Sequence, residues 1–120
     1  MNITQKRILL VEDEWLIGEY LADYLSEAGY DVQGPFPDVN KTLAFLSANI
    51  VDIGVLDVSL GKEKSFPIAE MLIQHAVPFL FLSGYVETDL PEAMRNVQLL
   101  AKPVQPAQLA AALSEMIAAP

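Results

Sequence analysis

Three carboxylates in this chain directly follow short apolar runs. Glu12 and Asp13 follow residues 8–11, and Asp57 follows residues 53–56. If these runs are parallel strands of one sheet, their carboxyl ends lie at the same edge, where open α/β sheets bind ligands. Mg²⁺ prefers oxygen ligands, and a buried carboxylate is costly unless it is paired or binds a metal. The pattern therefore predicts a pocket for a divalent cation, with Asp57 as a candidate nucleophile.

Two further apolar runs each end in a polar side chain. Ser83 follows residues 79–82, and Lys102 follows residues 99–101. An ammonium group opposite three carboxylates can pair with Asp57 in the empty pocket and with a phosphoryl oxygen in the filled one. Together these groups supply a nucleophile, metal ligands, a hydroxyl and a cation, which suits in-line phosphoryl transfer.

Each of these residues also has an ordinary structural explanation when it is considered alone. Asp57 suits a helix cap or a turn, and Ser83 suits a turn. Glu12 and Asp13 suit the N-terminus of a helix, where the helix dipole favours acids. The ammonium group of Lys102 at a strand end is usually just solvated. Pro103 makes the preceding peptide bond a candidate for the cis form. The functional interpretation depends on the occurrence of all these residues at strand ends.

The overall composition limits the class of protein. The 120 residues include 52% hydrophobic residues, which is enough for one domain over residues 1–120 with a single core. No apolar run approaches the ~20 residues that span a bilayer, and no signal peptide is predicted, so we expect a cytoplasmic protein without a membrane segment. The absence of cysteine excludes disulfides, zinc-thiolate sites and thiol nucleophiles. A net charge of −9 argues against nucleic-acid binding.

Apolar runs alternate along the chain with segments of helical period. This alternation predicts repeated βα units around a mainly parallel sheet, with five strands and five helical segments. Pro35 and Pro37 are expected to end the second strand. The strands are expected at residues 8–11, 31–34, 53–56, 79–82 and 99–101.

The first helix is expected to follow Asp13 and to run to about Ala28, with Gly29 in the C-terminal cap. Its inward face is predicted from apolar residues at three-to-four spacing. These residues are Leu16, Ile17, Tyr20, Leu21, Tyr24 and Leu25.

Capping residues indicate where other helices begin. Asp38 is expected to cap a helix that ends near Asn49, and Ser65 is expected to cap one with Pro67 in its first turn. The last helix is expected over residues 106–117.

Two connections are expected to hold little regular structure. Residues 58–64 are predicted to form a loop after the third strand. Between residues 84 and 97, only a helix of about two turns fits, with Asp89 and Glu92 at capping-box spacing.

The polar residues at the strand ends, in this order and within one domain, resemble the receiver domain of two-component response regulators. The resemblance spans essentially the whole chain, and five elements in order make it specific. It implies a doubly wound, flavodoxin-like α/β fold around a five-stranded parallel sheet with strand order 2-1-3-4-5.

The resemblance also implies a role for each polar residue. Asp57 would be the phospho-acceptor, Lys102 would contact the phosphoryl group, and Ser83 would be the switch hydroxyl. The cofactor would be Mg²⁺, and Ser59 would contribute a backbone carbonyl to it. The metal-binding residues would be Glu12, Asp13, Asp57 and Ser59.

The partners follow from the same resemblance. The phosphoryl donor would be a histidine kinase or a histidine phosphotransferase, and the output would be a contact with a downstream protein. The domain would catalyse only its own phosphorylation and dephosphorylation, so it would be a signalling domain rather than an enzyme.

Two features depart from the usual receiver pattern. Receivers usually carry Tyr or Phe three residues before the lysine, and this chain has Leu99 there. The stretch Phe81-Leu82-Ser83-Gly84-Tyr85 resembles the Phe-Ala-Thr-Gly-Tyr type motif of a subgroup that lacks that aromatic residue. We therefore predict that the signal travels through Tyr85 or the region 84–96. The alternative for Tyr85 is an ordinary aromatic residue in a turn.

Two other classes of protein share parts of this pattern. A haloacid-dehalogenase-type phosphatase also uses an aspartate nucleophile, Mg²⁺, Ser or Thr, and Lys, but it normally carries a second Asp where this chain has Ser59. A flavodoxin-like binding module would need a phosphate-binding loop after the first strand, where Glu12, Asp13 and Glu14 would repel phosphate.

Overall fold

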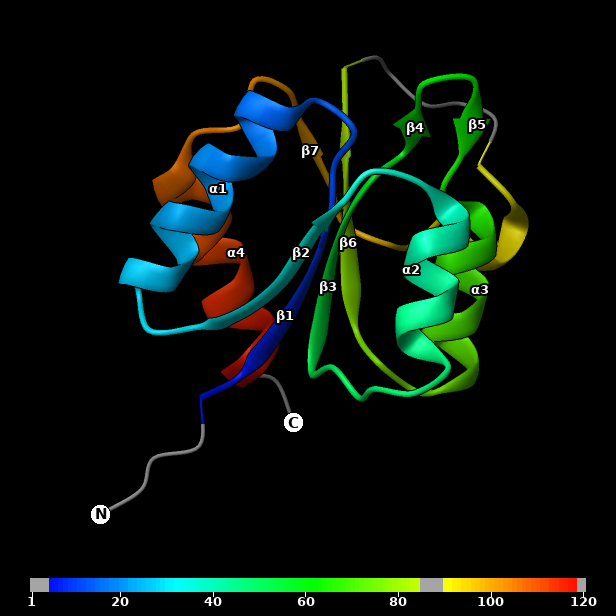
Figure 1. Ribbon diagram of the computed structural model, residues 1–120, viewed down its shortest axis with the longest axis horizontal. Coiled ribbons are helices and arrows are strands. Elements are labelled where there is room, and N and C mark those ends of the chain that lie inside the picture. The colour runs from blue at the N-terminus through cyan, green and yellow to red at the C-terminus, as the bar shows by residue number, and fades with distance from the viewer. Residues whose placement is uncertain (1–4, 85–89, 119–120) are drawn as a thin grey trace.

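A five-stranded parallel sheet forms the centre of the computed structural model, which describes residues 5–84 and 90–118. The strand order is β2-β1-β3-β6-β7. Because β4 and β5 form a separate hairpin, β6 and β7 are the fourth and fifth strands of the sheet, and the expected order 2-1-3-4-5 is confirmed. Helices α1 and α4 cover one face of the sheet, and α2 and α3 cover the other (Figure 1).

The strands and helices follow one another in the expected alternation. The strands of the main sheet are β1 (Arg7–Val11), β2 (Asp31–Phe36), β3 (Ile53–Asp57), β6 (Phe79–Ser83) and β7 (Leu99–Ala101). The hairpin strands are β4 (Ser59–Leu60) and β5 (Glu63–Lys64). The helices are α1 (Trp15–Glu27), α2 (Val39–Leu46), α3 (Phe66–Gln74), α4 (Pro106–Ala118) and a single 3-10 turn, η1 (Glu92–Met94).

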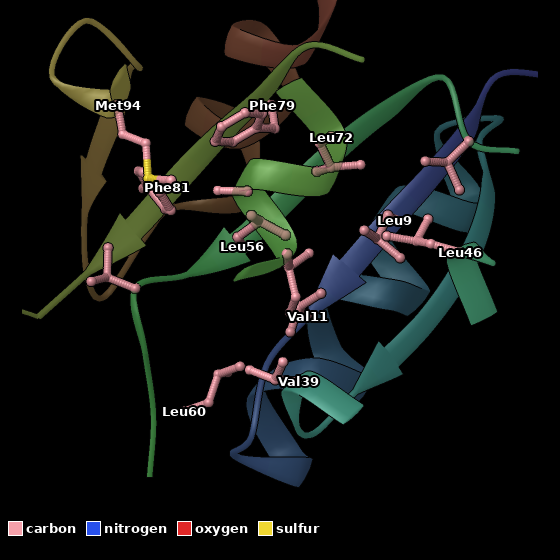
Figure 2. Packing of buried hydrophobic residues seen from close by; sticks show 14 residues of the cluster. Leu9, Val11, Val39, Leu46, Leu56, Leu60, Leu72, Phe79, Phe81 and Met94 are labelled. Carbon is pink, nitrogen blue, oxygen red and sulfur yellow. The ribbon is translucent and has the colours of Figure 1, made fainter. Parts of the chain in front are cut away.

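The central strands are apolar at nearly every position because helices cover both faces of the sheet. Along β1, Ile8 and Leu10 pack on the side of α1 and α4, whereas Leu9 and Val11 pack on the side of α2 and α3. Figure 2 shows the second of these two clusters, to which β1, β3 and β6 contribute side chains together with Leu72 of α3. The two-sided core holds the carboxyl ends of β1, β3 and β6 at one edge.

Strand β2 extends two residues beyond the expected end at Gly34, so the prediction that Pro35 ends it is wrong. The strand lies at the edge of the sheet and pairs only with β1. An edge strand tolerates proline because the missing N–H is not needed for a second neighbour. The register of the pair shifts between Leu9 and Val11, and the N–H of Glu12 donates to the carbonyl of Phe36 at 2.9 Å.

Helix α1 buries a narrower face than expected. Leu21 and Leu25 are buried, but Leu16 and Tyr20 are 73% and 61% exposed, so their predicted inward orientation is wrong. Gly18 sets the orientation, since a Cβ atom there would lie 2.9 Å from the side chain of Pro35. The face of the helix that includes Gly18 therefore packs closely on β2, and the first apolar residues of the helix lie outside that face.

Helix α2 begins as expected and ends early. The side chain of Asp38 accepts the N–H of Lys41 at 2.8 Å, which confirms the N-terminal cap. The helix ends at Leu46 rather than near Asn49. Side chains donate hydrogen bonds to backbone carbonyls near the end of the helix. The hydroxyl of Ser47 donates to the carbonyl of Ala44, and the amide of Asn49 donates to the carbonyl of Phe45. Such local bonds compete with continuation of a helix.

Residues 58–64, which were expected to form a loop, contain the antiparallel hairpin β4–β5. Gly61 allows the tight turn because its φ is +65°, in the left-handed region that favours glycine. The hairpin lies beside the carboxyl ends of the sheet strands (Figure 1).

Ser65 occupies the N-cap position of α3, but its predicted side-chain cap is absent. Its backbone has φ −82° and ψ 9°, which is not the extended conformation from which a cap usually bonds. Instead, the carbonyl of Ser65 accepts the N–H groups of Ile68 and Ala69. Pro67 lies in the first turn of α3, as expected.

The connection before β7 contains only η1 among its described residues, instead of the expected two turns of helix. Pro91 is extended, with ψ 149°, so the helical turn begins only at Glu92. Met94 is buried and packs in the core on the side of α2 and α3 (Figure 2). Asp89, the expected capping residue, and Tyr85 lie outside the described residues. No helix in the described part of the chain is long and apolar enough to cross a membrane.

Candidate functional site

Adjacent strands bring the three predicted carboxylates together. Asp57 is the last residue of β3, and Glu12 and Asp13 directly follow β1, which is its neighbour in the sheet. One oxygen from each of the three side chains lies within 4.8 Å of the others. Glu12 and Asp57 are buried, whereas Asp13 is exposed. The predicted grouping of these carboxylates is confirmed.

Lys102 places its ammonium group among the carboxylates. Its Nζ atom lies 3.0 Å from Oδ2 of Asp57, 3.2 Å from Oε1 of Glu12 and 3.6 Å from Oε1 of Glu14. The backbone N–H of Lys102 donates to the carbonyl of Ser83 at 2.8 Å, which fixes the chain at this point. The expected contact with Asp57 is present. The contact with Glu14 was not predicted, although Glu14 continues the acidic run in the sequence.

The peptide bond between Lys102 and Pro103 is cis, the form for which the sequence made it a candidate.

Glu12 differs from Asp13 in what surrounds it. Its side chain is fully buried, and both of its oxygens have partners. Oε1 accepts from Lys102, and Oε2 accepts the backbone N–H of Glu14 at 3.1 Å. Glu12 therefore orients Lys102 and the start of α1, whereas Asp13 lines the open part of the site.

One cation serves two buried carboxylates in this site. Burial raises the pKa of Asp57 to about 8, and the nearby carboxylate of Glu12 adds to this effect, against the opposing influence of Lys102. Burial lowers the pKa of Lys102, but its bonds and attraction to Asp57 and Glu12 outweigh burial and raise that pKa above its ordinary value. The site therefore has an excess of negative charge that a further cation would neutralise.

One oxygen of Asp57 lacks a partner. Oδ2 accepts from Lys102, but Oδ1 is buried and has no hydrogen-bond partner among the described residues. A buried carboxylate oxygen without a partner is costly. Oδ1 and the neighbouring carboxylate oxygens make a donor set that suits Mg²⁺. The residues present therefore fit a hard divalent cation.

A cleft of about 550 Å³ opens above Asp57. Ser83, at the end of β6, and Ser59, on β4, both contribute to its lining together with Asp13 and Lys102. Ser83 is buried, whereas Ser59 is half-buried. All the sequence-predicted site residues thus lie in or directly beneath one cleft, and Glu12 is the one that lies beneath.

Leu99 lies three residues before Lys102, on β7. It pairs with Phe81 across β7 and β6, and it is only partly buried against the core. The side chain is apolar and makes no polar link to the cleft. Tyr85 lies outside the described residues, so its predicted role remains a prediction.

Comparison with known proteins identifies the family. A profile described as the response regulator receiver domain matches residues 8–114. The chain belongs to this family. Receiver domains are phospho-accepting signalling domains, so the receiver interpretation is confirmed and the phosphatase alternative is not favoured.

Curated relatives of this receiver domain are longer proteins. The transcriptional regulatory protein PdtaR of Mycobacterium tuberculosis is 28% identical over 102 residues, which are 84% of this chain and 50% of PdtaR. The phyllosphere-induced regulator PhyR of Methylorubrum extorquens is 29% identical over 117 residues, which are 92% of this chain and 43% of PhyR. The chain thus spans about half, or less, of these relatives.

Solved receiver structures share the fold over nearly the whole chain. The solution structure of SdrG from Sphingomonas melonis Fr1 is 33% identical with a TM-score of 0.75, and the match covers 94% of this chain and 97% of SdrG. A CheY-like receiver domain from Methanospirillum hungatei JF-1 has a TM-score of 0.83 at 21% identity, covering 95% of this chain and 94% of that one. The latter supports the fold alone.

Proposed function

We propose that Asp57 accepts a phosphoryl group from a phosphohistidine on a histidine kinase or histidine phosphotransferase. The observation that carries this proposal is the state of the Asp57 side chain. It is 3% exposed at the base of a cleft, with Oδ2 hydrogen-bonded to Lys102 and with no partner for Oδ1 among residues 5–84 and 90–118. A carboxylate that accepts a hydrogen bond at one of its two oxygens is held in a fixed orientation, which favours nucleophilic attack.

The transfer proceeds in line on the phosphorus atom. One carboxylate oxygen of Asp57 forms a bond to phosphorus while the bond from phosphorus to the imidazole nitrogen of the donor breaks, and the nitrogen keeps the electron pair. Lys102 then exchanges part of its contact with Asp57 for a phosphoryl oxygen, and the hydroxyl of Ser83 donates to another. The product is an acyl phosphate on Asp57.

The same site returns the domain to its resting state. Attack of water on phosphorus breaks the bond to Asp57, releases inorganic phosphate and restores the carboxylate. Between these two events, the phosphorylated domain signals through contact with a downstream protein. The net charge of −9 supports a protein rather than a nucleic acid as this partner.

The proposed metal is Mg²⁺, held by Asp13 and Asp57 with Glu12 nearby and with the backbone carbonyl of Ser59. The ion, when bound, supplies positive charge that offsets the charges of the phosphoryl group and the carboxylates. The three carboxylate oxygens within 4.8 Å of one another support this assignment. The receiver function extends over residues 1–120, and the exchange takes place in the cytoplasm, as two-component signalling implies.

Intact-mass measurement after incubation with acetyl phosphate and Mg²⁺ tests this proposal. The wild type should gain one phosphoryl group, and Asp57→Asn should gain none. Asp23→Asn is a matched control, because Asp23 is an exposed aspartate on α1 away from the lining of the cleft. An adduct that persists in Asp57→Asn, or that is missing from the wild type, would contradict the proposal.

A further inference from the structure

The hairpin β4–β5 contributes a second lysine close to the cleft. Ser59 on β4 and Lys64 on β5 are directly opposite each other in the antiparallel pair. Residues opposite each other in such a pair project from the same face. The Nζ atom of Lys64 donates a hydrogen bond to Oγ of Ser59 at 2.9 Å. Ser59 lines the cleft, so Lys64 contacts the wall of the cleft through the hydroxyl group of Ser59.

The hairpin is anchored on the side away from the cleft. The side chain of Glu63 accepts the N–H of Val39, at the start of α2, at 3.1 Å. Leu60 is buried in the core near Val39 (Figure 2). The N–H of Ser65 donates to the carbonyl of Val58 at 2.9 Å, which closes the base of the hairpin. These bonds hold the backbone in place without Lys64, so the bond of Lys64 to Ser59 is not needed to form the hairpin.

The chemistry of the pair points toward an anion in the cleft. An ammonium group only donates hydrogen bonds, so Oγ of Ser59 is the acceptor, and the hydrogen of its hydroxyl remains available to donate. The positive charge on Lys64 polarises that hydroxyl and makes it a stronger donor. Among the described residues, the cleft lining otherwise carries the carboxylates of Asp13, Glu14 and Asp57 against the single ammonium of Lys102. A dianionic phosphoryl group gains from any further positive donor on this wall.

We propose that Lys64 is a positioning residue for the phosphoacceptor site, which orients the hydroxyl of Ser59 toward an oxygen of the phosphoryl group on Asp57. This inference rests on the proposed function of Asp57. Lys64 does not touch the reacting atoms and acts through Ser59. The pair adds a hydrogen-bond donor to those supplied by Lys102 and Ser83, and it stabilises the phosphorylated form.

Titration with beryllofluoride in the presence of Mg²⁺ tests the pair without a turnover step. Beryllofluoride imitates the phosphoryl group, and calorimetry reports its affinity. Lys64→Met and Ser59→Ala should each weaken binding roughly threefold to fivefold, the range expected for a solvent-exposed charged interaction. The double variant should lose no more affinity than Ser59→Ala alone, because Lys64 acts only through the hydroxyl that this change removes. Lys64→Arg should restore most of the affinity.

Lys62 provides the matched control. It is an exposed lysine on the same hairpin, and the structure gives its side chain no hydrogen bond or ion pair among the described residues. Lys62→Met removes the same charge from the hairpin and should leave the affinity within experimental error of the wild type. The lifetime of the acyl phosphate should shorten in Lys64→Met and not in Lys62→Met.

The outcomes separate the two proposals. If Lys64→Met equals Lys62→Met, or if the losses in the double variant add, the positioning role is wrong while phosphorylation of Asp57 stands. If the wild type binds no beryllofluoride and gains no phosphate from acetyl phosphate, the proposed function itself fails, and the role of Lys64 fails with it.

Discussion

Nζ of Lys102 lies 3.0 Å from Oδ2 of Asp57, and the same nitrogen also contacts Glu12 at 3.2 Å. One ammonium group therefore balances two carboxylates, both of which are buried. Burial, with the negative charge of Glu12 as a smaller cause, raises the pKa of Asp57 despite the ion pair. Stability, metal binding and phosphoryl transfer all depend on this excess of buried carboxylates over ammonium groups.

The first prediction concerns stability and pH. The pKa of Asp57 rises from 3.8 to about 8 in the folded protein, so the folded state holds this proton more tightly than the unfolded state. The contribution of Asp57 to stability is therefore fully present below about pH 4 and is lost as the pH rises toward 8. Asp57→Asn removes the titrating group. Its stability relative to the wild type should rise by roughly 1–3 kcal/mol between pH 5 and pH 9 in metal-free buffer.

Urea unfolding followed by circular dichroism checks this prediction, with Asp23→Asn as the control. Asp23→Asn should follow the wild type at every pH. If the stability of Asp57→Asn and that of the wild type changed in parallel with pH, the pKa of Asp57 would not be raised in the folded state, and the prediction would be wrong.

The second prediction concerns Mg²⁺. Because a metal binds the ionised carboxylate, Mg²⁺ and the proton compete for Asp57 below about pH 8. The affinity for Mg²⁺ should fall as the pH is lowered from 8 to 6, by up to about tenfold per unit if one proton is exchanged. Asp13→Ala should weaken both Mg²⁺ binding and phosphorylation. Calorimetry at several values of pH measures the affinity, and an affinity that Asp13→Ala leaves unchanged would exclude Asp13 as a ligand.

The third prediction concerns Lys102. Lys102→Met leaves Asp57 and Glu12 buried without their shared cation, which is costly when both are ionised. We expect a loss of roughly 1–3 kcal/mol of stability at pH 8, and a smaller loss at pH 5, where a proton neutralises Asp57. Phosphorylation by acetyl phosphate should become much slower. Lys62→Met serves as the control for the lost charge, and equal unfolding curves for both variants would refute the predicted cost.

The fourth prediction concerns Leu99. This side chain is partly rather than fully buried, so Leu99→Ala should cost about 1–2 kcal/mol, less than a fully buried leucine. Because Leu99 makes no polar contact with the cleft, phosphorylation of Asp57 should remain largely intact. Thermal unfolding and intact-mass measurements check the two halves of this prediction. A variant that folds normally but accepts no phosphate would assign Leu99 a direct role in the site.

The fifth prediction concerns the region 84–96, which follows Ser83. A hydrogen bond between a phosphoryl oxygen and Ser83 would pull on the start of this region. The buried side chain of Met94 anchors its end. We therefore expect the amide signals of residues 84–96 to show the largest changes on addition of beryllofluoride and to become more ordered. Amide hydrogen exchange and NMR measure this response. An unchanged region would mean that the signal leaves the site by another route.

The sequence alone determined the fold and the composition of the site. Apolar runs that end in polar residues specify parallel strands, and the carboxyl ends of parallel strands meet at one edge whatever the details of packing. That rule is sufficient to bring Asp13, Asp57, Ser83 and Lys102 together. The N-terminal cap at Asp38 could also be predicted from residues close in the chain, but the same rule failed at Ser65, whose backbone is not extended.

The tertiary structure decided which side chains are exposed to solvent and which carboxylates lie next to the ammonium group of Lys102. The orientation of α1 depends on the contact between Gly18 and Pro35, which are far apart in the sequence, so periodicity alone could not show that Leu16 is exposed. The division of Lys102 between Glu12 and Asp57 likewise depends on distances across strands and on burial. Electrostatic energies vary steeply with distance and with exposure to water. A sequence lists the charges, and only the packed structure sets how strongly they act on one another.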